Sequence, residues 1–170
     1  DILGFTDQNG ITGVFASGTL TLSGTASIAD YQLALRSITY ENTSDAPNTL
    51  TRQVSISVND GIGSSSSFTR DIIITGVNDL PTCSGTIAAI NYTEGDGAVL
   101  LDDGLVIADP DNVNLSGATI SIITEYTNPE DILAFPGLSG ISGVYTAGTL
   151  TLNGTASLAD YQTALRSITY

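Results

Sequence analysis

A stretch of 40 residues occurs twice in this chain, and this internal repeat most constrains the fold. Residues 1–40 begin DILGF and residues 131–170 begin DILAF, and both end ALRSITY. Aligned without a gap, these twin blocks are identical at 28 of 40 positions and lie 130 residues apart. A period of 130 residues is an ordinary domain length. The sequence therefore predicts a window from a tandem array, with 1–79 as the C-terminal part of one repeat and 80–170 as the N-terminal part of the next. We expect both repeats to be incomplete and the polypeptide to continue in both directions.

Each twin block contains a helical pattern between stretches that alternate like β-strands. Ser27 followed three residues later by Asp30 is a capping-box pattern, in which side chains satisfy exposed amides at a helix start. The apolar residues that follow at helical spacing are Ile28, Tyr31, Ala34 and Leu35. We therefore expect a helix over about 28–35 that lies across the sheets, with Arg36 favoured at its C-terminal end by the helix dipole. The same residue types recur in the second block.

The remaining segments alternate apolar and polar residues as strands do. Residues 50–77 predict a β-hairpin that turns at NDGIG, and the run Ile72–Ile74 predicts a strand covered on both faces. Pro81 and its polar neighbours mark the boundary between the units. Further strand patterns are IAAINYTEG (87–95), AVLLDDG (98–104), LVIADPD (105–111) and ATISIITEY (118–126). About nine short strands per unit, separated by frequent turn signals, predict an all-β fold of β-sandwiches, each with one short helix.

The charge of the chain is strongly negative. Eighteen acidic residues face 4 Arg with no Lys or His, giving a net charge of −14. Such a surface repels phosphate groups, so we expect neither nucleic acid nor an anionic membrane as a partner. No stretch is long enough to span a bilayer, so no membrane insertion is expected in this segment. The lone Cys83 leaves two interpretations open, an intermolecular disulfide or a half-buried small apolar residue.

Four segments carry a resemblance to a known family. They are VNDLP (77–81), YTEGDGAVLL (92–101), ADPDNVNLSGATISI (108–122) and SLADYQTALRSITY (157–170), and the last is the most specific. They resemble the cadherin-like tandem repeats of very large surface proteins, which occur in bacterial adhesins and in some algal and protist extracellular proteins. The resemblance covers nearly the whole chain. It implies an extracellular array of cadherin-like (Ig-like) β-sandwiches, often stiffened by Ca²⁺ between domains.

The resemblance also implies candidate calcium ligands. Ca²⁺ takes six to eight oxygen ligands, and six acids with no base lie between residues 94 and 111. In the family, an Asn-Asp pair in the linker joins an Asp-x-Asp loop of the following domain. The matching positions are Asn78, Asp79, Asp109 and Asp111, with Asn114 as a carbonyl donor and Glu94 as the counterpart of the family's early-strand glutamate. The Asp-Arg-Glu-type triplet of cadherins is absent, which leaves each site short of a carboxylate. The alternative interpretation of 109–112 is a simple turn, since Asp, Pro and Asn all favour turns.

Other chemistry has less support in the sequence. Without His, and with one Cys, the usual nucleophile–base pairs are missing, so we expect no enzyme. Glycosylation sequons occur at Asn42, Asn91, Asn114 and Asn153, and they matter only if the source is a eukaryote.

The expected function is structural. The predicted protein is a repeat of an extracellular adhesin, stalk or filament, contacting neighbouring repeats of its own chain or identical subunits in a fibre. The alternative is a ligand-binding module that recognises glycans or a cell-surface protein. An aromatic content of 6% without Trp argues against a sugar-binding platform.

Overall fold

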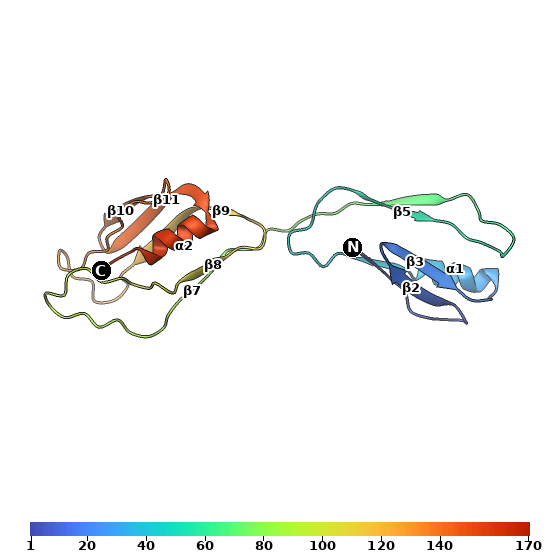
Figure 1. Ribbon diagram of the computed structural model, residues 1–170, viewed down its shortest axis with the longest axis horizontal. Helices are drawn as coiled ribbons and strands as arrows, with labels where there is room; N and C mark the ends of the chain where they lie inside the picture. Colours follow the sequence, from blue (N-terminus) through green and yellow to red (C-terminus); the bar gives the residue numbers. More distant parts are fainter. The chain divides into compact units, whose positions relative to one another are not determined.

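The computed structural model describes residues 1–170, which divide into two compact units, Asp1–Val77 and Asn78–Tyr170 (Figure 1). The first unit contains β1 (Ile2–Gly4), β2 (Thr12–Ala16), β3 (Thr19–Ser23), α1 (Ile28–Arg36), β4 (Thr39–Glu41), β5 (Arg52–Ile56) and β6 (Phe68–Ile72). The second contains β7 (Thr82–Ser84), β8 (Val106–Ala108), β9 (Asn114–Ser121), β10 (Ser142–Thr146), β11 (Thr149–Ser157) and α2 (Leu158–Arg166). Regular structure is therefore mainly β-strand, with one short helix in each unit. The units meet at 77/78, where the sequence predicted a boundary at 79/80.

Each twin block forms the same tight β-hairpin, β2–β3 in the first unit and β10–β11 in the second. The connecting pairs, Ser17-Gly18 and Ala147-Gly148, all have positive φ angles, between 47° and 81°. Two successive positive φ values define the type I′ turn, whose twist matches that of the flanking strands. Glycine at the second position removes the steric cost of that conformation.

Each hairpin leads into a helix that begins as the sequence predicted. The Ser27 hydroxyl accepts a hydrogen bond from the Asp30 backbone N–H at 3.1 Å and donates to the Asp30 carboxylate at 2.5 Å. Ser157 and Asp160 repeat these contacts at 3.1 and 2.6 Å. The cap differs from the standard capping box because the carboxylate binds the serine hydroxyl. An N-cap of this kind contributes about 1 kcal/mol to helix stability.

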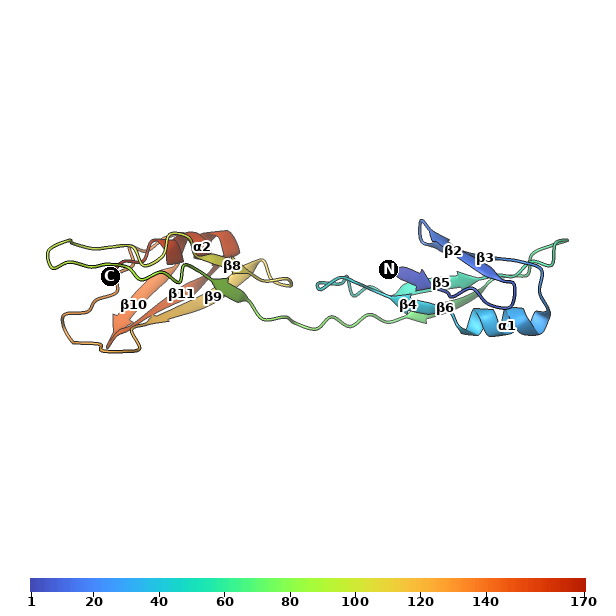
Figure 2. The same cartoon turned by 90° about the horizontal axis from the view of Figure 1, so that it is seen from below.

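The second unit contains a three-stranded antiparallel sheet in the order β10–β11–β9. Strand β11 pairs with β9 from Thr149↔Ser121 to Ser157↔Asn114, with a register irregularity after Asn153. The separate β7–β8 ladder lies beside the sheet, and α2 packs on β8, β9 and β11 (Figure 2). The predicted placement of the helix against strands is confirmed for this unit.

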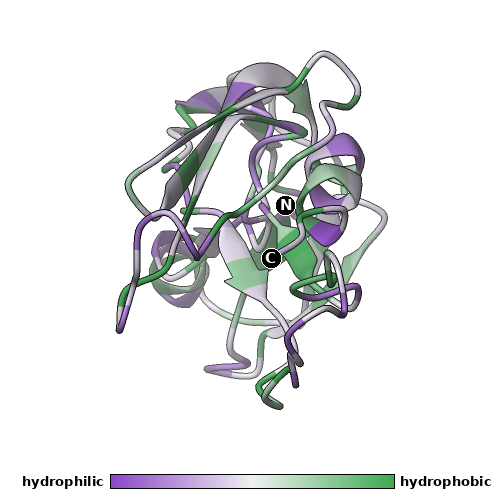
Figure 3. Cartoon of the chain, turned by 90° about the vertical axis from the view of Figure 1, so that its left-hand side faces the viewer, coloured by the Kyte–Doolittle hydropathy of each residue, from purple (hydrophilic) through white to green (hydrophobic).

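The hydrophobic core gathers in the second unit. Nine of the eleven buried apolar residues form one cluster there, and all nine come from the second twin block: Leu133, Ile141, Leu150, Leu152, Ala156, Tyr161, Ala164, Leu165 and Ile168. Partly buried residues of the preceding segment, including Leu105, Ile107 and Ile120, pack against it. Outside this core, hydrophobic and hydrophilic residues are interspersed in strands and loops alike (Figure 3).

The first unit uses the same block sequence with much less burial. Its strands pair only two by two, as β1–β4, β2–β3 and β5–β6, so β3 has no partner on the side opposite β2. Only Ile11 and Ala34 are buried, whereas Leu22 and Tyr31 stay half-buried. The difference follows from the neighbours, because the second block has β8 and β9 against it.

Three local predictions are wrong. Ile73 is 82% exposed and lies beyond the end of β6, so the Ile72–Ile74 run is not a strand covered on both faces. Strand β6 pairs with β5 alone, and no second layer covers it. Residues 87–101 form no strand beyond a bridge between Leu100 and Thr169. Strand β9 begins at Asn114, before the expected 118–126, because its register follows the β11 partner.

The two blocks offer a matched pair of truncations. Leu152→Ala removes a side chain with 0% exposure and should destabilise the second unit by about 2–5 kcal/mol. Leu22→Ala, at the equivalent half-buried site, should cost the first unit less than about 2 kcal/mol because little cavity forms. Native-state amide exchange of α1 and α2 resolves the two units. Equal losses at both sites would contradict the assigned difference in burial.

Candidate metal site

The predicted Asp-x-Asp loop forms a closed turn at the end of β8. The Asp109 carboxylate accepts hydrogen bonds from the backbone N–H of Asp111 at 3.0 Å and of Asn112 at 2.9 Å. The Asn112 side-chain amide donates to both oxygens of Asp109, at 3.3 and 3.2 Å. These donors favour the charged carboxylate, and the Asn112 N–H is the main cause of the lowered pKa of Asp109. The side chain of Asp109 is half-buried.

The linker pair Asn78–Asp79 joins this turn. The Asn112 amide donates to the Asn78 side-chain oxygen at 3.2 Å, and the Asp79 backbone N–H donates to the Asp111 carboxylate. Four of the six predicted ligand residues therefore belong to one hydrogen-bonded network. Asn112 connects its members, although the sequence analysis did not name it as a ligand. Its position directly after Asp-Pro-Asp was the available signal.

The other two predicted ligands lie outside this network. Asn114 begins β9 and pairs with Ser157. Glu94 is exposed in the loop between β7 and β8 and shares no hydrogen bond with the turn. Nowhere in the chain do three or more His, Cys, Asp or Glu side chains converge as a metal cluster.

Several acids outside this turn also hold their own loops together. The Asp102 carboxylate accepts from the backbone N–H of Thr86 at 2.6 Å and of Gly104 at 2.8 Å, and these bonds lower its pKa. Asp60 accepts from the N–H groups of Ile62 and Gly63, both at 2.9 Å, at the turn of the β5–β6 hairpin. At these places the sequence pattern of acids with Gly, Pro and Asn corresponds to turn stabilisation.

This arrangement supplies part of a calcium shell. The network around Asp109 holds two carboxylates and two carboxamides, and the full shell takes six to eight oxygens. Its carboxylate oxygens accept backbone or side-chain N–H groups, so a cation would have to replace those donors. The residues therefore fit a weak, water-completed site better than a dedicated cage.

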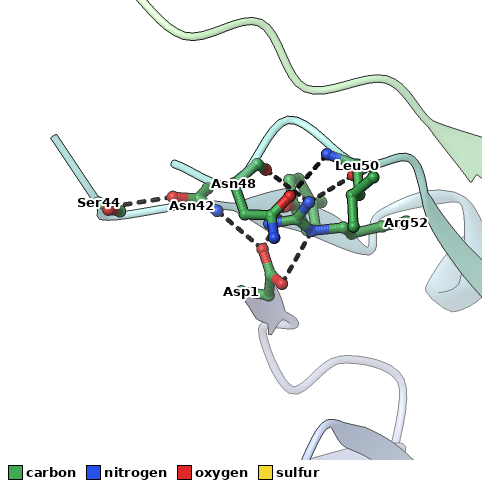
Figure 4. Close-up of polar contacts among 7 residues, drawn as sticks. Asp1, Asn42, Ser44, Asn48, Leu50 and Arg52 are labelled. Atoms are coloured by element: carbon green, nitrogen blue, oxygen red, sulfur yellow. Dashed lines mark hydrogen bonds and ion pairs between the residues drawn. The ribbon is translucent and has the colours of Figure 1, made fainter. Parts of the chain in front are cut away.

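An Asp–Tyr contact recurs at the same place in both twin blocks. The Tyr40 hydroxyl donates to the Asp1 carboxylate at 2.5 Å, and the Tyr170 hydroxyl donates to that of Asp131. In the first unit, Asp1 also accepts from Asn42 at 2.8 Å and from Arg52 at 3.1 Å (Figure 4). This exposed ion pair is worth at most about 1 kcal/mol. Its main effect is to tie the start of β1 to the loop before β5.

The remaining predicted sites are accessible to differing degrees. Asn91, Asn114 and Asn153 are exposed, whereas the Asn42 side chain is half-buried and its amide donates to Asp1. Cys83 is a free, exposed residue of β7, so its side chain is not half-buried as one interpretation held. No helix of the chain has the length and hydropathy needed to cross a bilayer.

Comparison with known proteins finds a relative of far greater length. Over 140 residues the chain is 32% identical to Halomucin of Haloquadratum walsbyi (strain DSM 16790 / HBSQ001). The match covers 78% of this chain and 2% of Halomucin. No protein-family model matches the chain, and no solved structure matches it.

The Asp–Tyr contact makes the second unit sensitive to acid. The Tyr170 hydroxyl, followed by the Thr127 backbone N–H, lowers the pKa of Asp131 below its ordinary 3.8. A lowered folded-state pKa means that this stabilisation is present above about pH 4 and is lost as the pH falls through the folded value. Tyr170→Phe should therefore raise the Asp131 pKa and weaken the second unit at neutral pH.

Carboxyl-carbon NMR titration of Asp131 measures this directly. Tyr40→Phe is the matched control, since Asp1 keeps its Asn42 and Arg52 donors and should titrate with a smaller change. An unchanged Asp131 titration in Tyr170→Phe would show that the hydroxyl contact does not form in solution.

Proposed function

We propose that this chain is a structural segment of a very large extracellular surface protein, in which cadherin-like β-sandwich repeats follow one another at intervals of 130 residues. Its function is to span distance, as part of an adhesin, stalk or filament, with neighbouring repeats as its partners. It performs no catalysis. The observation that carries the proposal is the recurrence of one folded block at a fixed spacing.

The two blocks agree in contacts as well as in sequence. Both use the same hairpin turn, the same serine cap and the same buried-ring contact, in which the Tyr31 hydroxyl donates to Gly24 O at 2.6 Å and that of Tyr161 to Gly154 O at 2.5 Å. Repeated units that each contact only their neighbours build extended proteins whose length scales with repeat number. That is the property a stalk or filament requires.

The similarity to Halomucin supports a surface location. That large surface protein matches 78% of this chain over 2% of its own length, as expected for one segment of a long array. A net charge of −14 also suits a hydrated, solvent-exposed protein, because mutual repulsion keeps such chains soluble.

Labelling of intact cells tests this location. Antibodies raised against residues 1–170 should bind unpermeabilised cells of the source organism, and electron microscopy of the purified protein should show regular thin fibres. Labelling that needs permeabilisation would contradict the proposal. Selective binding of the chain on a glycan array would favour the ligand-binding module instead.

Calcium binding at the Asp109 turn is a further part of this proposal. The network supports it by holding Asp109 and Asp111 beside the linker residue Asn78, where a cation would reduce the flexibility of the linker. Because the carboxylates now accept N–H groups, the expected affinity is low, in the range of about 10⁻⁴–10⁻³ M that extracellular modules show.

Isothermal titration with CaCl₂ tests the site, at constant ionic strength so that simple charge screening is held fixed. Asp109→Asn and Asp111→Asn should abolish the heat, whereas Asp103→Asn, an exposed acid outside the network, should preserve it. Absence of binding at millimolar Ca²⁺ would leave 109–112 as a turn alone.

A further inference from the structure

The same apolar face is covered in one unit and open in the other. Leu150, Leu152 and Tyr161 are 2%, 0% and 0% exposed, while their sequence equivalents Leu20, Leu22 and Tyr31 are only half-buried. The local elements are alike, since hairpin, cap and tyrosine hydrogen bond are present in both. The segment preceding the second block accounts for the difference in burial.

Two helix side chains bind that preceding segment in the second unit. The Gln162 side-chain oxygen accepts the Ile107 backbone N–H at 3.1 Å, and the Arg166 guanidinium donates to the Leu105 carbonyl at 2.7 Å. Together they hold the backbone of β8 against α2. The equivalent residues, Gln32 and Arg36, have the same positions on α1 and are exposed.

The strands show the same contrast. In the second unit β11 is paired on both sides, by β10 and by β9, whereas β3 is paired by β2 alone. The end of the second block is also paired, because Leu101 N–H donates to Ile168 O at 3.0 Å and Val99 N–H to Tyr170 O at 2.9 Å. An unpaired strand edge beside exposed apolar residues is a template for a further strand.

We propose that the open face of the first unit is the docking surface for a segment like residues 99–121 of another repeat in the same array, joined to Asp1 as Glu130 is joined to Asp131. A β9-like strand pairs with β3, and a β8-like strand lies against Gln32 and Arg36. This proposal rests on the tandem-array part of the proposed function, and its test is independent of cellular location.

The choice of occupant follows from the identity of the contact residues. The second-block residues that pair with or hydrogen-bond this segment at six places are Leu150, Leu152, Gln162, Arg166, Ile168 and Tyr170. All six are identical in the first block, at Leu20, Leu22, Gln32, Arg36, Ile38 and Tyr40. A surface with the same apolar, strand-edge and polar groups fits the same ligand in the same register. Asn153, which pairs with Gly117, is replaced by Ser23, and Gly117 presents no side chain to that position.

The test extends the full chain by a second copy of residues 78–130 placed directly before Asp1. Hydrogen exchange should slow by more than about tenfold in β3 and α1 of the extended chain, because an open edge becomes part of a cooperative core. The control carries Ala118→Pro in the added copy only, since proline removes a ladder hydrogen bond and disfavours a paired strand. Unchanged exchange in β3 and α1 of the extended chain would overturn the proposal.

A matched pair of helix variants checks the register. In the unextended chain, Arg166→Ala should accelerate exchange in α2, whereas Arg36→Ala should leave exchange in α1 unchanged because it has no strand to bind. In the extended chain, Arg36→Ala should accelerate exchange in α1 by the same factor that Arg166→Ala produces in α2. If the unextended chain instead dimerises and protects β3 in proportion to its concentration, a second chain is the occupant and the proposed occupant is wrong.

Discussion

The packing of residues 99–121 against the second twin block is the interaction on which the compact part of this protein depends. It brings β8 and β9 against α2 and β11 and takes nine apolar side chains of the block out of water. Burying one large aliphatic side chain fully is worth about 1.5–3 kcal/mol, so such a cluster dominates the stability of a small unit. Isolated helices of nine residues are marginal in water, and α2 therefore owes its stability to this contact.

Local elements of the block form whether or not the face is covered. The hairpin turn at Ser17-Gly18, the serine cap and the tyrosine-to-glycine hydrogen bond recur with nearly the same geometry in both units. Each joins residues within seven positions of one another, so a short stretch of sequence specifies it. The chain thus separates local shape, which the block encodes by itself, from burial, which requires a segment outside the block.

The acidic residues show the same division between local and long-range effects. Asp60 and Asp102 each accept backbone N–H groups within their own loops, and Asp109 closes its turn in the same way. These bonds keep the carboxylates ionised by lowering their pKa values. A surface that carries many such turns is hydrated and negative even before any cation binds. The Asp109 turn is distinct because it also reaches the linker through Asn112 and Asn78.

Sequence alone determined the repeat spacing, the helix beginning at Ile28, the β5–β6 hairpin and the predominance of β-structure, because all of these follow from local patterns or from direct alignment of the blocks. It also predicted four of the residues that meet around the Asp109 turn. It could not predict that Glu94 lies elsewhere or that residues 87–101 form no regular strand, since loop paths depend on what packs beneath them. The register of β9, the exposure of Ile73 and the unequal burial of identical leucines were decided by tertiary structure. The physical reason is that burial depends on distant neighbours, and two copies of one sequence with different neighbours take on different burial.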